Sequence, residues 1–142
     1  MNTVTFLKDI DRPEVVDWHP DFNEAGAFAC EFVFSALLSG NMTENQTVNL
    51  IRCLFRLRFH TGEQRVFAEI LRHCRSDSFR VRSVSVRLAS GLIGLAAACP
   101  IPSRKLKPTL EDLLILKEGL TLGVDEATHT QAMGILSGRL GT

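Results

Sequence analysis

The chain has 142 residues, of which 45% are hydrophobic and 23% are charged. These values are close to the averages of soluble globular proteins and exclude fibrous and disordered classes, and the length fits a single domain spanning residues 1–142. Sixteen basic and sixteen acidic residues give a formal net charge of zero. They are segregated, with eight acids and two bases in residues 1–51, three acids and twelve bases in 52–107, and five acids and two bases in 108–142. Such segregation predicts a surface whose local field attracts a charged partner.

The N-terminal segment does not have the pattern of a secretion signal, because charged residues interrupt it from Lys8 to Arg12. The longest apolar run, Leu88 to Cys99, is broken by Ser90 and two glycines and is shorter than the ~20 residues of a membrane span. We therefore expect a cytoplasmic protein with no membrane segment. The four cysteines lie more than twenty residues apart, which predicts buried reduced thiols rather than a zinc or redox motif.

In chain order, the first predicted element is a short helix. Pro13 favours a helix start, and Pro20 ends a helix that would cover Glu14 to Trp18. Trp18 is the only tryptophan. We expect it to cover the first pair of long helices, with an exposed binding anchor as the alternative.

Six main helices follow, each marked by a capping residue that accepts a hydrogen bond from a backbone amide. The predicted caps are Asp21 with Glu24, Thr43 with Gln46, Thr61 with Gln64, Asp77, Thr109 with Asp112, and Asp125. The predicted stops are Gly40, Gly62, Cys99 with Pro100, Gly123 and Gly141. Residues 81–86 also alternate as in a strand, but their apolar positions continue at helical spacing to Leu95, which favours a helix. The proline-rich residues 100–108 are predicted to form a loop.

The six helices group into hairpins of approximately 21–60, 61–99 and 109–141. First helices begin at 21, 61 and 109, so the repeat spacing is 40 and then 48 residues, near the period of helical solenoids. Three hairpins are the smallest number that buries a continuous core by stacking. The predicted fold class is all-α, an α-α superhelix.

One segment carries a family resemblance. The string Asp77-Ser78-Phe79-Arg80-Val81-Arg82, followed by Leu88-Ala89-Ser90-Gly91-Leu92, resembles the second helix of a HEAT repeat. The third hairpin departs from this pattern, with His129-Thr130 in place of Val-Arg. The resemblance implies a HEAT-like superhelix in which Asp77 and Arg82 connect neighbouring repeats.

No motif for catalysis, metal or cofactor binding is present. The four histidines, His19, His60, His73 and His129, never stand four residues apart, and no phosphate-binding glycine motif occurs. His73 and Cys74 are neighbours, but adjacent side chains on a helix point in different directions. We therefore expect a protein that is not an enzyme and has no cofactor.

The middle third contains nine arginines and no lysine between Arg52 and Arg87. Guanidinium groups make two-point hydrogen bonds to carboxylates or phosphates. The predicted contacts to an acidic partner are Arg52, Arg56, Arg72, Arg80 and Arg87. The alternative binding face, for a basic partner such as a nuclease, consists of Asp9, Asp11, Glu14 and Asp17. A third interpretation is that the arginines pair with the chain's own acids.

In its small size, its expected fold and its lack of catalytic motifs, the chain resembles small bacterial immunity or antidote proteins. The resemblance implies a non-catalytic protein that binds and neutralises a partner protein, such as a toxin. Two alternatives remain open: binding of nucleic-acid backbones, and a scaffold subunit that assembles with itself. The near-neutral isoelectric point of 6.9 and the absence of basic residues interleaved with exposed aromatics argue against nucleic acid. The sequence leaves the oligomeric state open.

Overall fold

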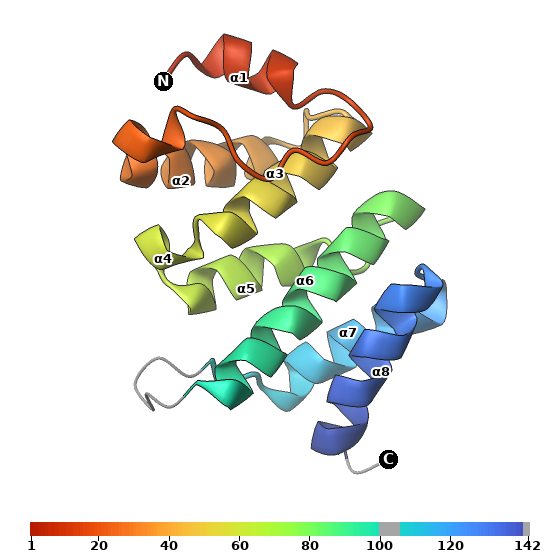
Figure 1. Cartoon of the computed structure of the whole chain (residues 1–142). Coiled ribbons are helices and arrows are strands. Elements are labelled where there is room, and N and C mark those ends of the chain that lie inside the picture. The colour runs from red at the N-terminus through yellow and green to blue at the C-terminus, as the bar shows by residue number, and fades with distance from the viewer. Residues whose placement is uncertain (100–105, 141–142) are drawn as a thin grey trace. The chain divides into compact units, whose positions relative to one another are not determined.

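The computed structural model describes residues 1–99 and 106–140, and within these residues it contains eight α-helices and no strand (Figure 1). The predicted all-α class is confirmed. The chain divides into two compact units, Met1–Gly62 and Glu63–Thr142, each of which is described by itself. The expectation that residues 1–142 form one repeat domain stays a prediction.

Unit 1 contains α1 (Thr3–Asp9), α2 (Phe22–Ser39), α3 (Glu44–Arg56) and α4 (Arg58–Thr61). The helix pair α2 and α3 forms the body of this unit, and α4 packs against both. Phe6 from α1 is fully buried, and its ring centroid lies 5.6 Å from that of Phe22 and 6.0 Å from that of Phe32. This aromatic cluster joins the N-terminal helix to α2.

The N-terminal helix differs from the prediction. Residues Glu14 to Trp18 are not helical, and the short helix lies earlier, at Thr3–Asp9. Asn2 caps it by accepting a hydrogen bond from the Thr5 amide. The prediction was wrong because the Val16 amide and the carbonyls of Ile10, Arg12 and Glu14 hydrogen-bond to the side chain of Asn49 rather than within a helix.

Unit 2 contains α5 (Glu63–Arg72), α6 (Phe79–Ala98), α7 (Leu110–Leu122) and α8 (Glu126–Leu140). The long helix α6 lies at its centre and packs against the other three (Figure 1). By length and composition alone α6 could cross a membrane, but 61% of its apolar window is buried. Such burial is typical of the core helix of a soluble protein.

Three of the six predicted caps were confirmed. Thr43 with Gln46 and Thr109 with Asp112 form capping boxes, and Asp125 accepts from the Thr128 amide. Other caps were wrong. Asp21 makes no capping bond, and Ser78 rather than Asp77 caps α6. Thr61 ends α4, so α5 begins after Gly62, and Leu57 separates α3 from α4.

The predicted stops at Pro100 and Gly141, and residues 100–105 of the predicted loop, lie outside the described residues. Gly40 and Gly123 follow α2 and α7 with positive φ angles of 71° and 110°. Both glycines therefore end their helices as expected, since side chains are strained in this region.

Candidate recognition surface

A non-helical segment of unit 1, residues 10–20, crosses α3, and we call it the strap (Figure 1). It is held by Asn49, whose side chain is fully buried. The Asn49 amide nitrogen donates to the carbonyls of Ile10, Arg12 and Glu14 at 2.9, 3.1 and 3.2 Å. Its Oδ1 accepts from the Val16 amide at 3.0 Å. One side chain thus replaces the internal hydrogen bonds that a helix would have supplied.

Further contacts fix the N-terminal end of this region. The Thr43 hydroxyl donates to Asp11 at 2.8 Å, and the Gln46 amide donates to the Leu7 carbonyl at 3.1 Å. Beneath the strap, the Cys53 thiol donates to the Val16 carbonyl at 3.6 Å. Burial, and secondarily the charge of Asp17, raises the pKa of Cys53 to about 12. This thiol therefore remains protonated and serves as a packing group.

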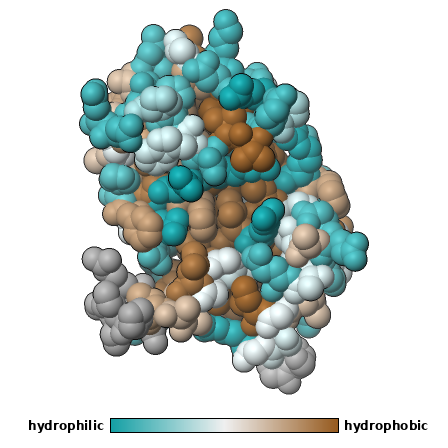
Figure 2. Space-filling model, viewed as in Figure 1, coloured by the Kyte–Doolittle hydropathy of each residue, from teal (hydrophilic) through white to brown (hydrophobic). Residues whose placement is uncertain are grey.

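The strap presents apolar side chains among carboxylates. Val15 is 66% exposed and Trp18 is 36% exposed. Figure 2 shows a hydrophobic patch surrounded by hydrophilic residues where the strap crosses α3. Three of the four acidic residues predicted as the alternative face lie on the strap, where Asp11 and Glu14 are exposed and Asp17 is half-buried, and the fourth, exposed Asp9, ends α1 next to it. This part of the chain therefore presents exposed apolar side chains together with carboxylates, and two arginines lie with them: exposed Arg12, and Arg56 over the Trp18 ring.

The end of α3 and the start of α4 carry a second feature, which we call the corner: Phe55, Arg56, Arg58 and Phe59. The Arg58 guanidinium lies 4.3 Å from the ring centroids of both Phe55 and Phe59. Phe59 is nevertheless 70% exposed. Arg56 lies 5.9 Å from the ring centroid of Trp18. The strap and the corner therefore meet where Trp18 contacts Arg56.

The corner was missed by sequence reasoning, and one expectation about it was wrong. Basic residues do alternate with aromatics in the string Phe55-Arg56-Leu57-Arg58-Phe59, where Phe55 is half-buried and Phe59 is exposed. The alternation of aromatic and basic residues is visible in the sequence, but the exposure of Phe59 depends on the break between α3 and α4 at Leu57. A continuous helix was predicted here. The Trp18 prediction holds in part, because its ring packs edge-on against Phe22 at 5.1 Å while part of it stays exposed.

The five arginines predicted to bind a partner are divided between the two units. Arg52 and Arg56 lie on α3, where Arg52 donates to Asn49 Oδ1 at 2.9 Å. Arg72 ends α5, and Arg80 and Arg87 lie on α6. Arg80 also has an interaction partner, and Arg87 is exposed. The structure therefore gives most of these side chains contacts within the chain, and their role in binding stays a prediction.

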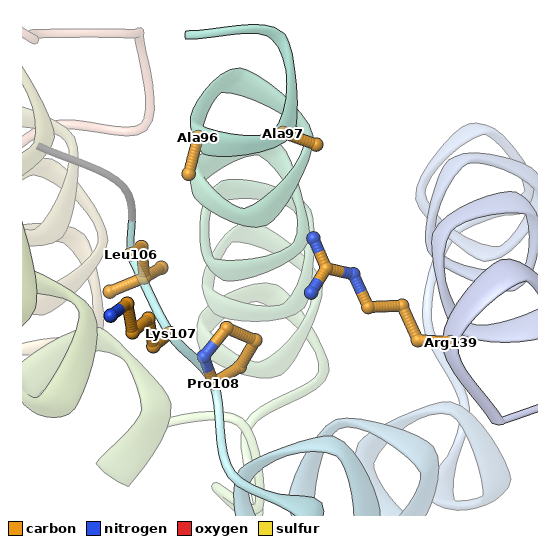
Figure 3. Close-up of a pocket in the computed structure, with 6 residues that line it drawn as sticks. All are labelled: Ala96, Ala97, Leu106, Lys107, Pro108 and Arg139. Atoms are coloured by element: carbon orange, nitrogen blue, oxygen red, sulfur yellow. The ribbon is translucent and has the colours of Figure 1, made fainter. Parts of the chain in front are cut away.

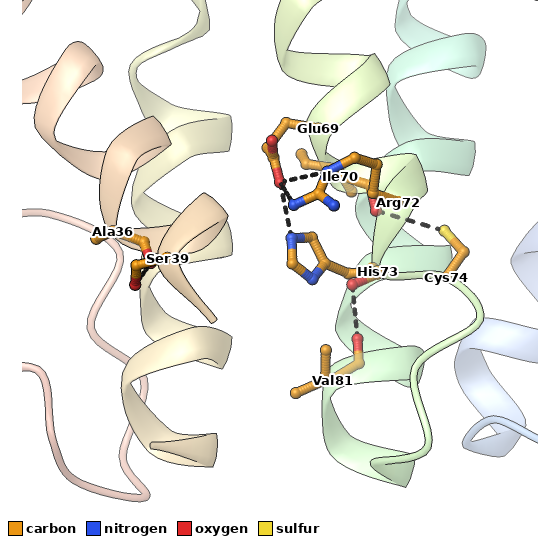
Figure 4. Close-up of polar contacts among 9 residues, drawn as sticks. Ala36, Ser39, Glu69, Ile70, Arg72, His73, Cys74 and Val81 are labelled. Carbon is orange, nitrogen blue, oxygen red and sulfur yellow. Dashed lines mark hydrogen bonds and ion pairs between the residues drawn. The ribbon is translucent and has the colours of Figure 1, made fainter. Parts of the chain in front are cut away.

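Arg72 belongs to a polar cluster in unit 2 (Figure 4). The buried Glu69 carboxylate accepts from Arg72 Nε and Nη2 at 3.1 and 2.9 Å, and it lies 2.8 Å from His73 Nε2. Burial alone would raise the pKa of Glu69, but the hydrogen bonds from His73 and Arg72 outweigh it and lower the pKa. Glu69 is therefore ionised at neutral pH and compensates the charge of Arg72.

Arg82 is a structural residue of unit 2. Its guanidinium donates to the carbonyls of Gly123 at 2.6 Å, Ser76 at 2.8 Å and Leu122 at 3.4 Å. It thereby connects α6 to the turn between α7 and α8. Asp77, expected to share this role, is exposed and forms no hydrogen bond with Arg82, both residues being within the described part. The cap at Ser78 makes the aspartate unnecessary for the start of α6.

The described residues contain no group of three or more His, Cys, Asp or Glu side chains that could hold a metal ion. The Cys74 thiol donates to the Ile70 carbonyl of its own helix at 3.7 Å, and burial raises its pKa well above the usual range. Cys74 is therefore not poised as a nucleophile for the adjacent His73.

A shallow pocket of about 460 Å³ lies in unit 2, lined by Ala96, Ala97, Leu106, Lys107, Pro108 and Arg139 (Figure 3). The Arg139 guanidinium extends toward Ala97, whereas the Lys107 ammonium points away from Arg139. The two cations do not converge on one position, so the pocket lacks the convergent polar groups of a ligand site.

Comparison of the chain with protein-family models, curated proteins and solved structures finds no match. Within its described residues the protein is all-helical, and its surface includes one non-helical segment, the strap, that buried hydrogen bonds hold in place.

Proposed function

We propose that this chain is a non-catalytic protein-binding module that binds and neutralises a partner protein, in the manner of small immunity or antidote proteins. We also propose that its helix pairs α2 and α3, α5 and α6, and α7 and α8 are HEAT-like repeats of an α-α superhelix. The contacts of Arg82, which link one helix pair of unit 2 to the next, support this arrangement.

The observation that carries the proposed function is the fixing of the strap by Asn49. A fully buried amide is costly unless its hydrogen bonds are made, and here four of them go to a surface segment while Arg52 of the same helix supplies a fifth. The result is a non-helical segment held in one conformation. Holding a binding segment in place before contact reduces the entropy lost on association.

The composition of the surface indicates the kind of partner. Exposed Val15 and Trp18 supply apolar anchors on a segment that carries three carboxylates and one arginine, Arg12. Interfaces commonly combine an apolar centre with a charged rim, and complementary charge accelerates association. The strap therefore fits a protein surface with an apolar depression and a basic rim. The arginines of α5 and α6 are the alternative contact set, for an acidic partner.

Affinity capture with charge-reversal variants tests this function. The tagged chain, captured from a lysate of its source organism, should retain one or a few proteins. The variant Glu14→Lys with Asp17→Lys should retain at least tenfold less of these proteins. Glu111→Lys with Glu126→Lys is the matched control, because it makes the same change in net charge at exposed residues of unit 2. Equal capture by all three chains would contradict the proposed use of the strap.

Nucleic-acid binding is a second candidate, favoured by the corner. Stacked Arg58 and exposed Phe59 are the side-chain types on which unpaired bases stack. Against it, residues 1–62 contain eight acids and five bases, and this net negative charge repels phosphates. Capture that disappears after nuclease treatment of the lysate would favour this candidate over protein binding.

A further inference from the structure

The strap and the corner have opposite charge and lie side by side. The strap carries the acids Asp11, Glu14 and Asp17 against one base, Arg12, and is therefore net negative. The corner carries Arg56 and Arg58, and the Arg56 guanidinium over the Trp18 ring marks the boundary. A surface that is negative on one side of a line and positive on the other is complementary to itself. When a second copy is turned by a two-fold axis along that line, each acidic half faces a basic half.

Apolar side chains on both sides of the boundary supply the attraction that charge alone does not. Val15 and Trp18 lie on the acidic side and Phe59 on the basic side, and each remains exposed. Arg58 restrains Phe59 by stacking on its ring at 4.3 Å, and Asn49 restrains the strap next to Val15. Aromatic and arginine side chains held in this way are typical of the residues that dominate protein interfaces.

We propose that, in the absence of another partner, this surface binds a second copy of the same chain as a closed two-fold dimer. The strap of each copy lies on the corner of the other. The proposal goes beyond the proposed function and does not depend on it, since it concerns the isolated chain. A partner protein that this chain neutralises would have to displace the second copy, because both bind to the strap.

Sedimentation velocity of the purified full chain tests the dimer. At about 0.1 M salt the mass should approach twice the 15.8 kDa of the chain. At about 1 M salt, where exposed charges are screened, the dissociation constant should rise at least tenfold. A chain that sediments as a monomer at every accessible concentration, or that forms assemblies larger than a dimer, would overturn the proposal.

Two charge-reversed variants make the test specific. Glu14→Arg with Asp17→Arg makes both halves of the surface basic, and Arg56→Glu with Arg58→Glu makes both halves acidic. Each variant alone should be monomeric, because like charges face each other in its dimer. Their mixture should form a heterodimer, which also shows that both variants are folded. A wild-type dimer that persists in either variant, or a mixture that stays monomeric, would show that this surface is not the interface.

Discussion

Asn49 illustrates how a single residue determines local structure in this protein. Its side chain contacts the strap 33 to 39 positions earlier in the sequence. The Arg52 guanidinium adds a further bond to the same Oδ1. Removal of this amide would leave several buried backbone groups without partners, and each such group costs free energy.

We predict that Asn49→Leu lowers the free energy of unfolding by about 3 kcal/mol, because the Val16 amide and three carbonyls lose their partner. Urea denaturation measures this change, and hydrogen exchange of the Val16 amide reports release of the strap. The control Asn23→Leu, at an exposed position of α2, should change stability by less than about 0.5 kcal/mol. A protected Val16 amide in Asn49→Leu would contradict the assigned role.

Glu69 gives a pH-dependent prediction. Its pKa is lowered in the folded chain from an ordinary value of 4.5, so its contribution to stability is present above pH 4.5. The contribution is lost as the pH falls through the lowered folded pKa, where the native carboxylate is protonated. Glu69→Gln should therefore cost about 2 kcal/mol at neutral pH, because bonds to a charged group are lost.

Urea denaturation from pH 7 to pH 3 measures this difference, which should shrink below pH 4.5. Glu118→Gln is the control, because Glu118 pairs with Arg75 at an exposed site and such pairs contribute less than about 1 kcal/mol. A cost of Glu69→Gln that is independent of pH would show that the carboxylate charge is not what stabilises unit 2.

At the scale of helices, the close packing of unit 2 depends on one glycine of α7. A Cβ atom at Gly119 would lie 2.6 Å from the Cys74 carbonyl oxygen and 2.9 Å from Val86 Cγ2. The backbone would have to move to make room for this Cβ atom, since the nearest atom is a backbone carbonyl oxygen. Gly134 of α8, by contrast, has no atom within 4 Å of such a Cβ.

We predict that Gly119→Ala lowers the free energy of unfolding by about 2 kcal/mol through overpacking. Gly134→Ala should raise it by up to about 1 kcal/mol, because alanine favours the helix and meets no obstacle. Thermal and urea denaturation of the two variants provide the comparison. Equal effects of the two substitutions would refute the contact between α7 and the end of α5.

The sequence predicted those elements whose determinants are local. The capping boxes at Thr43 and Thr109 each lie within four residues, and both were predicted correctly. The strap could not be predicted, because its conformation depends on Asn49, far away in the sequence. The arginines were recognised as unusual, but a partner such as the Gly123 carbonyl for Arg82 lies 41 residues away and becomes visible only in the fold. The pair of Arg72 with Glu69 is local, at i and i+3 on one helix, and was overlooked. The corner could have been predicted from the alternation of aromatic and basic residues between Phe55 and Phe59, but it was overlooked.

At the scale of the whole molecule, charge segregation along the sequence corresponds to different uses of charge in the two units. Three carboxylates of unit 1, those of Asp11, Glu14 and Asp17, lie on the strap, whereas Arg72 and Arg82 of unit 2 are bound to a carboxylate and to backbone carbonyls. Net charge of zero therefore conceals one outward-facing acidic surface. Because of this difference, we propose that the strap and the corner, rather than the arginines of α5 and α6, bind a partner.

Site-specific photo-crosslinking in the source organism tests this account most directly. A photoreactive residue is placed at Val15 or Phe59 on the proposed surface, and at Arg87 or Leu114 in unit 2 as comparison, all four positions being exposed. The account predicts covalent protein adducts from positions 15 and 59, with either a partner protein or a second copy of the chain. Adducts only from positions 87 or 114 would contradict it and place recognition on unit 2.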